Sequence, residues 1–205
     1  MSRLRVAPIV EGHGEVAAVP ILLRRIWGEL LAGEYLDVLQ PVRVPRTKVV
    51  RHVDGGPSSV QGPELARAVA LASRKIADHS DQAMPALILV LLDANSDCPA
   101  KLAPQFSDLL PSANVACVLA RVEYETWFVG AADSLGDYLT LDDDDPAPAD
   151  PEGQGCGKAW VKKRFRRYSE TVDQPRMTAQ MDLKKCRERS PSFDKLCREL
   201  QRRLT

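Results

Sequence analysis

The sequence lacks several features that would place it in a class at once. Its five cysteines are odd in number and form no CxxC pair, which argues against a disulfide framework and against the usual zinc sites. No apolar run approaches the roughly 18 consecutive residues of a membrane span. The first residues contain no long apolar segment followed by a small-residue cleavage site. We therefore expect a cytoplasmic protein with reduced thiols and no membrane partner.

An excess of either charge is also missing, yet the charges are unevenly distributed. The chain has 28 basic and 28 acidic residues. Residues 131–157 contain eight acidic residues and no basic ones, whereas residues 158–205 contain fifteen basic residues and six acidic ones. A basic segment is compatible with a polyanion partner, although basic helix faces are commonly just solvated. We expect the basic segment to contact nucleic acid, with simple solvation as the alternative.

Hydrophobic periodicity predicts strands and helices that alternate along the first 140 residues. Strands are expected at residues 3–10, 37–44, 86–93 and 114–121, and helices at residues 15–32, 63–79, 101–110 and 125–139. Residues 45–62 are rich in Arg, Gly, Pro and Ser and are expected to form a loop. The alternation predicts an α/β fold with a mostly parallel, four-stranded sheet flanked by helices.

The rest of the chain predicts a loop followed by helices. Residues 141–157 are acidic and proline-rich, and their four successive aspartates lack the spacing of a calcium loop, so we expect a solvated loop. Helices are expected at residues 158–168, 178–189 and 192–204, with Thr178 and Ser192 as N-caps. We expect residues 158–205 to form a basic helical extension packed on the same domain.

Acidic or amide side chains follow three of the predicted strands at the point where each strand ends. They are Glu11 and Glu15 after the first strand, Asp93, Asn95 and Asp97 after the third, and Glu123 and Glu125 after the fourth. In open α/β sheets, ligands bind outside the carboxyl ends of the strands. Unrelated solvated carboxylates would have no reason to gather at this rim, so we expect a common site.

Carboxylates held this close repel one another, and a divalent cation removes the repulsion. Oxygen ligands without His or Cys favour Mg²⁺ or Mn²⁺. Mg²⁺ typically takes one or two carboxylates together with phosphate oxygens of a substrate. The natural substrate of such a site is a phosphodiester, whose phosphate the metal polarises.

The stretch VEGHGE at residues 10–15 leaves two other interpretations open. It lacks the GK[ST] ending of a P-loop. Gly12, Gly14 and Ala17 fit the looser GxGxxA form of a dinucleotide loop, but the second strand ends in VRVP, without the acidic residue that would hold a ribose hydroxyl. A solvated turn, with glycines that serve the backbone or the close approach of a ligand, is the plain alternative.

The motifs VEGHGE, LILVLLDANSDCP and RVEYETWF, in this order, resemble the Toprim domain of topoisomerases, bacterial-type primases, small RNA-maturing nucleases and OLD-family nucleases. More narrowly, the chain is similar to the Toprim-like family DUF4276 of bacterial proteins, to which the stretch DQPRMTAQMDLKKCRERSPSFDKL also corresponds. The resemblance covers most of the chain. It implies a Toprim-like domain over residues 1–140 and rests on the order and strand placement of short motifs.

The resemblance implies roles for individual residues. Glu11 matches the Toprim glutamate, a general acid or base, and Asp93 matches the first metal-binding Asp of the DxD motif. Asn95 departs from that motif, because an amide oxygen binds a metal without bringing charge, and Asp97 occupies a third acidic position that compensates. Further acidic positions of the family are matched by Glu15 and Glu125, with Glu123 adjacent. The implied catalytic residues are Glu11 and Glu15, and the implied metal ligands are Glu11, Asp93, Asn95, Asp97, Glu123 and Glu125.

Two functions of different classes follow. The first is a Mg²⁺-dependent Toprim-like phosphodiesterase, a nuclease on DNA or RNA, whose basic C-terminal helices contact backbone phosphates. Family context implies a role beside a partner ATPase in phage defence or mobile elements. The second is a non-catalytic Toprim-like subunit, weakened by Asn95, that docks on an ATPase or on nucleic acid. A phosphatase for small phosphoesters is a third alternative.

Overall fold

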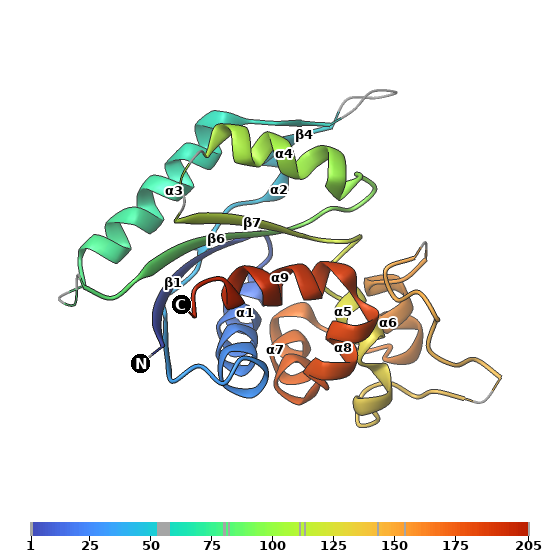
Figure 1. The fold of residues 1–205 in the computed structure, drawn as a ribbon. Helices are drawn as coiled ribbons and strands as arrows, with labels where there is room; N and C mark the ends of the chain where they lie inside the picture. Colours follow the sequence, from blue (N-terminus) through green and yellow to red (C-terminus); the bar gives the residue numbers. More distant parts are fainter. Residues whose placement is uncertain are drawn as a thin grey trace.

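A central β-sheet covered by helices on both faces forms the structure (Figure 1). The computed structural model describes residues 2–52, 58–79, 81, 83–110, 112, 114–142, 144–153 and 155–204. Within these ranges no helix is both long enough and apolar enough to cross a bilayer. The fold is the mixed α/β class with a mostly parallel sheet that the sequence predicts.

The sheet is built from parallel strand pairs. Its order is β2 (Tyr35–Val38), β1 (Arg3–Val10), β6 (Ala86–Asp93) and β7 (Val115–Ala120), and β3 (Val42–Arg43) also pairs with β1. The predicted strand at 37–44 is therefore two short strands, of which β2 lies along the start of β1 and β3 along its end. Pro41 lies between them and lacks the N–H that would continue the ladder. The predicted four strand positions are thus confirmed, with the second one interrupted.

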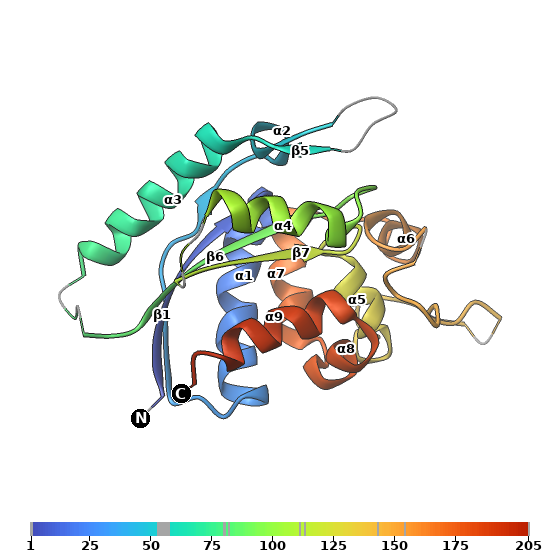
Figure 2. The ribbon, with the colours of Figure 1, turned by 45° about the horizontal axis from the view of Figure 1, so that its top comes forward.

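Both faces of the sheet are covered because β1 and β6 are apolar at nearly every position. One core lies on the face covered by α1 (His13–Arg25), its π-helical continuation Ile26–Leu30 and the C-terminal helices. The other core lies beneath α2 (Arg46–Val49), α3 (Gly62–Ala77) and α4 (Pro99–Leu109). Figure 2 shows these two helical layers on opposite sides of the sheet.

The C-terminal segment is helical, as predicted, and packs on the same face as α1. Its helices are α6 (Lys158–Arg164), α7 (Glu170–Gln180), α8 (Leu183–Arg189) and α9 (Pro191–Gln201). Helix α7 runs beside α1, and α9 lies against β7. The aromatic residues Trp127 and Phe128 are fully buried there, in α5 (Thr126–Gly130).

Several predicted helix boundaries are wrong. The helix expected at 125–139 is only α5 followed by the 3₁₀ turn Ala132–Ser134, and the helix expected at 158–168 ends at Arg164. The helix expected at 178–189 is interrupted, because Asp182 caps the start of α8 by accepting hydrogen bonds from the N–H groups of Lys184 and Lys185.

Thr178 and Ser192, the two residues predicted as N-caps, do not cap a helix, because each hydroxyl donates a hydrogen bond to another group. Thr178 lies inside α7, and its hydroxyl donates to the carbonyl of Gln174 at 2.7 Å. Ser192 lies inside α9, whose N-cap residue is Ser190, and the Ser192 hydroxyl donates to Glu152.

The segment predicted as a loop at 45–62 contains regular structure. It includes α2 and the antiparallel pair β4 (Val50–Arg51) and β5 (Ser59–Val60). Residues 53–57 of this segment lie outside the described residues. Among the described residues of the acidic segment 141–157, no helix or extended strand occurs, in agreement with the expected loop. The loop is not solvated throughout, because Glu152 and Cys156 are buried.

Gly14 allows α1 and α7 to approach closely. A Cβ at this position would collide with the side chain of Gln174 and with the backbone carbonyl of Glu170. We expect Gly14→Ala to lower the free energy of unfolding by about 1–3 kcal/mol, because the two helices would have to separate. Gly28→Ala is the control, since nothing lies within 4 Å of its Cβ. Denaturant titration of both variants checks this, and equal stability of the two would contradict it.

Candidate functional site

Five of the predicted acidic residues meet at the carboxyl end of the sheet. Glu11 follows β1, Glu15 lies in the first turn of α1, Asp93 ends β6, and Glu123 and Glu125 follow β7. Strands β1, β6 and β7 are parallel neighbours, so these side chains arrive at one rim. Their charges act on one another, chiefly on Asp93. We call these five residues the carboxylate cluster.

Glu15 links the first two parts of the carboxylate cluster. Its carboxylate accepts a hydrogen bond from the backbone N–H of Glu11 at 3.0 Å, and only 5% of the residue is exposed. Burial raises the pKa of Glu15 to about 7, and repulsion from Glu11 and Glu125 adds to the effect. Glu15 is therefore a carboxyl group able to exchange a proton near neutral pH.

Asp93 lies at the centre of the carboxylate cluster. Its Oδ1 accepts a hydrogen bond from the backbone N–H of Tyr124 at 2.9 Å, which ties the end of β6 to the segment after β7. Burial raises the pKa of Asp93 well above its ordinary value. The other four carboxylates raise it further, in the order Glu15, Glu125, Glu11 and Glu123. A cation bound here would relieve this repulsion.

Glu125 and Glu123 receive hydrogen bonds from the C-terminal segment. The hydroxyl of Tyr168 donates to Glu125 Oε1 at 2.9 Å, and the backbone N–H of Lys158 donates to Glu123 Oε2 at 2.7 Å. Burial raises the pKa of Glu125, although Lys158 and the Tyr168 bond oppose this. Gly157 has φ +99°, and a Cβ there would lie 2.6 Å from Glu123 Oε2. Only glycine therefore fits at this close approach.

Lys158 brings a positive charge to the rim of the carboxylate cluster. Its ammonium group lies 3.1 Å from a carboxylate oxygen of Glu170. Burial alone would lower the pKa of Lys158, but Glu125, Glu170 and Glu123 outweigh it and raise the pKa. Lys158 therefore stays charged and offsets part of the negative charge of the site.

Arg46 provides a second cation, from the other side of the sheet. Its guanidinium donates to the backbone carbonyls of Asp93 at 2.9 Å and Ala94 at 3.3 Å, and it forms an ion pair with Asp97. Burial raises the pKa of Glu11, and the positive charge of Arg46 opposes this effect. Through these contacts Arg46 holds the loop after β6 in place, and its charge lies close to the carboxylate cluster.

Asn95 and Asp97 are not brought into the carboxylate cluster. Asn95 is exposed and has φ +51°, a left-handed conformation that asparagine adopts more readily than most residues. Its N–H donates to the carbonyl of Val122, which is itself left-handed with φ +65°. The carboxylate of Asp97 is held by Arg46 and accepts a bond from the Ser58 hydroxyl at 2.6 Å. The role of either residue as a metal ligand stays a prediction.

We expect Arg46→Ala to destabilise the protein strongly. The substitution leaves the partly buried carboxylate of Asp97 without its cation and frees two carbonyl groups, so the free energy of unfolding should fall by about 3 kcal/mol. Lys48→Ala changes an exposed residue of the same short helix and should have an effect within about 0.5 kcal/mol. A double-mutant cycle with Asp97→Ala checks the pairing. Additive losses would show that the two side chains do not interact.

The carboxylate cluster suits a metal ion chemically but is not pre-arranged around one. In the described part of the chain, no three His, Cys, Asp or Glu side chains converge as ligands of one ion. Four of the five cluster carboxylates accept hydrogen bonds from the protein instead. One oxygen of Glu11, however, is buried and has no hydrogen-bond partner. A buried, unpartnered oxygen beside several carboxylates with raised pKa values fits a hard cation such as Mg²⁺.

The remaining residues of the VEGHGE motif lie away from these contacts. His13 is exposed. Gly14 serves the packing of α7 against α1, and Gly12 has an ordinary extended conformation at φ −95°. Sequence reasoning missed Arg46, Lys158 and Tyr168. No sequence motif around Lys158 or Tyr168 indicates that these residues contact the site. Gly157, just before Lys158, is the one local signal, because a glycine can indicate a close approach of the backbone to another group.

The chain was compared with known families, curated proteins and solved structures. No curated protein and no solved structure matches it significantly. A family model described as "Domain of unknown function (DUF4276)" matches residues 10–201, which include every residue of the carboxylate cluster. The resemblance seen in the sequence is confirmed at this level, and the chain belongs to the DUF4276 family.

Proposed function

We propose that the protein is a Mg²⁺-dependent phosphodiesterase of Toprim-like type, a nuclease that acts on DNA or RNA. The observation that carries the proposal is the carboxylate cluster, delivered by three adjacent parallel strands and left with one unpartnered oxygen on Glu11. Acidic groups whose pKa values are raised this way are frequent at catalytic sites. Without a cation, so many neighbouring carboxylates would only cost stability.

Asp93 and Glu11 are the residues proposed to hold the metal first, with Glu123 and Glu125 beside them. A bound Mg²⁺ would polarise the phosphate and lower the pKa of a water molecule. Glu15, with a pKa of about 7, is suited to accept or donate a proton at neutral pH. Lys158 and Arg46 add positive charge near the site, which favours binding of a phosphate group.

Nucleic acid is the proposed substrate because exposed cations lie beside the carboxylate cluster. Eight of the basic residues of 158–204 form ion pairs with described carboxylates, so most of this charge is used internally. Lys162, Arg166 and Arg167 are exposed and form no ion pair in the described part of the chain. They lie between Lys158 and Tyr168, which both contact the cluster. This stretch is our candidate for contacts with backbone phosphates.

The wider context belongs to the same proposal. Kinship with the Toprim superfamily, a partner ATPase and a role in phage defence or mobile elements are implied by the resemblance of the motifs. They stay predictions, because the family itself is described only as a domain of unknown function.

A metal-dependent cleavage assay tests the proposal. The protein is incubated with Mg²⁺, Mn²⁺ or EDTA and with single- and double-stranded DNA and RNA. We expect cleavage that needs the metal and falls by about 10²-fold or more in Glu11→Gln. Glu188→Gln, which alters an exposed residue of α8, should cleave like wild type. Equal activity of Glu11→Gln and wild type would remove Glu11 from the mechanism, and absence of cleavage on every substrate would count against the nuclease.

A non-catalytic docking subunit is the second candidate, favoured by the outward position of Asn95 and the internal ion pair of Asp97. Metal affinity separates the two functions. Sub-millimolar Mn²⁺ binding that is lost in Asp93→Asn supports the enzyme. No detectable binding of Mg²⁺ or Mn²⁺ supports the docking subunit.

A further inference from the structure

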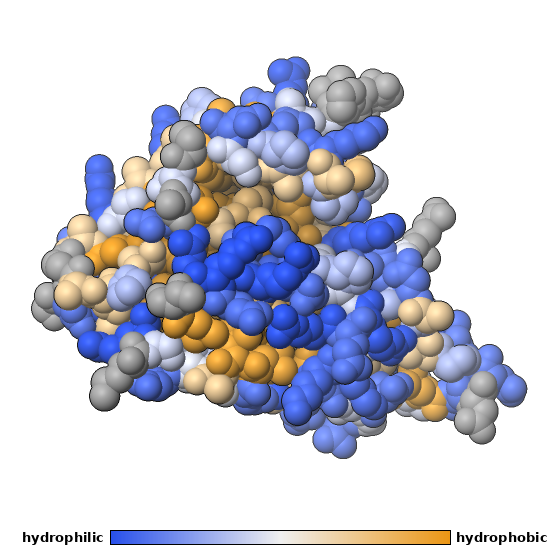
Figure 3. Space-filling view, in the orientation of Figure 1, coloured by the Kyte–Doolittle hydropathy of each residue, from blue (hydrophilic) through white to orange (hydrophobic). Residues whose placement is uncertain are grey.

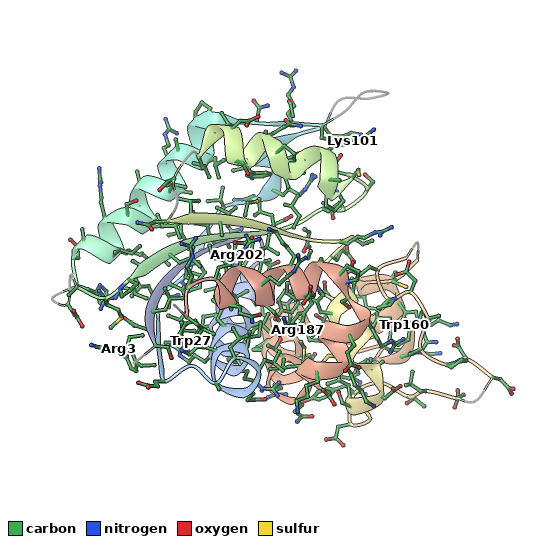
Figure 4. The ribbon with its side chains drawn as sticks, in the orientation of Figure 1. Arg3, Trp27, Lys101, Trp160, Arg187 and Arg202 are labelled. Atoms are coloured by element: carbon green, nitrogen blue, oxygen red, sulfur yellow. The ribbon has the colours of Figure 1, made fainter. Side chains whose placement is uncertain are left out.

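A cleft of about 980 Å³ opens beside the carboxylate cluster and has no role in the proposed reaction. Its lining comes from β7, the start of α4, the start of α9 and the loop before α6. Figure 3 shows the hollow on this face, with an apolar floor between hydrophilic side chains of α4 and α9. In Figure 4, the labels of Lys101 in α4 and of Arg202, just beyond α9, mark the helices on opposite sides of β7. Because the starts of both helices line the cleft together with β7, the cleft follows the outer edge of the sheet.

The floor of the cleft is a strand edge whose outward backbone groups have no strand partner among the described residues. Strand β7 pairs with β6 on one side and is the last strand of the sheet. The carbonyls of Asn114 and Ala120 accept hydrogen bonds from β6 and its extension. Because backbone groups alternate in direction along a strand, the N–H and C=O groups of Cys117 and Leu119 point away from β6. Both residues line the cleft, so their peptide groups face it.

The chemistry and shape of the cleft select one kind of occupant. A second copy of this chain has its own β7 edge recessed between helices, so two such edges cannot reach each other. Single-stranded nucleic acid normally stacks its bases on aromatic side chains, and no aromatic residue lines the cleft in the described chain. An extended peptide is one strand wide and offers the alternating N–H and C=O groups that complete a sheet edge.

The charges around the cleft indicate the composition of that peptide. Arg121 is exposed and forms no ion pair with a described residue. Lys195 and Arg198 of α9 are partly exposed on the same wall, although each has an ion-pair partner on its own helix. Of the two lining carboxylates, Asp97 is paired with Arg46, and Glu152 accepts hydrogen bonds from Ser192 and lies within reach of the charge of Arg121. Three lining cations against these two carboxylates leave the cleft positive on balance.

We propose that this cleft binds an extended, acidic peptide segment of a partner protein, which adds a strand to the edge of β7. The N–H and C=O groups of Cys117 and Leu119 hydrogen-bond to the peptide backbone. Apolar side chains of the peptide lie on the floor, and its acidic side chains face Arg121, Lys195 and Arg198. The cleft contains none of the five residues of the carboxylate cluster, and peptide binding there needs no metal ion.

Selection from a phage-displayed library of random octapeptides tests the proposal, with the full-length protein in EDTA as bait. We expect enriched sequences in which apolar residues alternate with Asp or Glu. A selected peptide should bind at least tenfold more weakly to Arg121→Glu, which reverses a lining charge, and to Ala100→Trp, which fills the cleft from an exposed position on α4. Arg176→Glu, an exposed change on α7, is the matched control and should bind like wild type.

Hydrogen exchange locates the peptide directly. The backbone amides of Cys117 and Leu119 should exchange more slowly when a selected peptide is bound. The proposal is overturned if no peptide is enriched, if the enriched peptides are basic, or if they bind without protecting these two amides. It is also overturned if an oligonucleotide or a second copy of the chain protects them instead.

Discussion

Asp93→Asn is expected to abolish metal-dependent cleavage while making the metal-free protein more stable. Activity should fall by about 10³-fold or more, because the central ligand of the proposed metal loses its charge. The free energy of unfolding in EDTA at pH 8 should rise, because burial and four neighbouring carboxylates disfavour the ionised form of Asp93, which asparagine does not have. Asparagine keeps an oxygen that can accept the hydrogen bond from the Tyr124 N–H.

The opposite directions of these two effects make the prediction specific. A residue with only a structural role would lose stability and activity together when replaced. Asp108→Asn is the matched control, since Asp108 is exposed on α4 and should change neither quantity. Cleavage assays and denaturant titrations in EDTA measure the two effects. A destabilised Asp93→Asn protein would show that Asp93 stabilises the fold as an ion and would argue against a crowded carboxylate cluster.

The second large effect expected is a loss of stability of the metal-free protein as the pH rises. Glu15 has a folded-state pKa of about 7 against an ordinary 4.5, so folding favours its protonated form. Its contribution is fully present below pH 4.5 and is lost as the pH rises through 7. The difference is on the order of 3 kcal/mol. Asp93 and Glu125 act in the same direction because their pKa values are also raised.

Glu15→Gln isolates this contribution from the other titrating groups. Glutamine can still accept the hydrogen bond from the Glu11 N–H but does not ionise. In EDTA the variant should become progressively more stable than wild type between pH 5 and pH 8, as measured by denaturant titration. A pH-independent difference between the two proteins would refute the raised pKa.

Mg²⁺ should reverse the loss at pH 8 in wild type. A ligand that binds only the folded state adds about 2.7 kcal/mol at a concentration one hundred times its Kd. The gain should be smaller at pH 5, where protonated carboxylates compete with the metal, and it should be absent in Asp93→Asn. An equal gain in Asp93→Asn would place the metal elsewhere.

The sheet could be predicted from the sequence because its central strands are buried on both faces. The run ALILVLLD of β6 and the run VACVLA of β7 are apolar for that reason. Local signals were less reliable in the C-terminal segment. Helix α7 contains Pro175, which is unusual inside a helix, and Thr178 resembles an N-cap. The sequence therefore predicts that a helix begins at Thr178, where α7 is in fact about to end. Its position is set instead by packing against α1, where Gly14 leaves room for it.

The candidate site was predictable only as far as sheet topology determines it. Strand ends carry Glu11, Asp93, Glu123 and Glu125 to one rim, and Glu15 follows one turn later. The contacts that hold the site depend on segments distant in sequence, since Arg46 reaches Asp93 across 47 positions and Tyr168 reaches Glu125 across 43. No local pattern encodes such contacts. Asn95 was predicted to be a metal ligand because of its place in the DxD-like motif. In the structure it adopts a left-handed conformation in the turn after β6.

The hydrogen bonds from Lys158 and Tyr168 have a consequence for the order in which the protein is made. A nascent chain that has reached residue 157 contains all five acidic residues but neither Lys158 nor Tyr168. The carboxylates of Glu123 and Glu125 then lack the partners that the finished protein supplies. Glu123 and Glu125 gain these partners only after residues 158–168 have left the ribosome, so the proposed metal site cannot be completed before that point of synthesis.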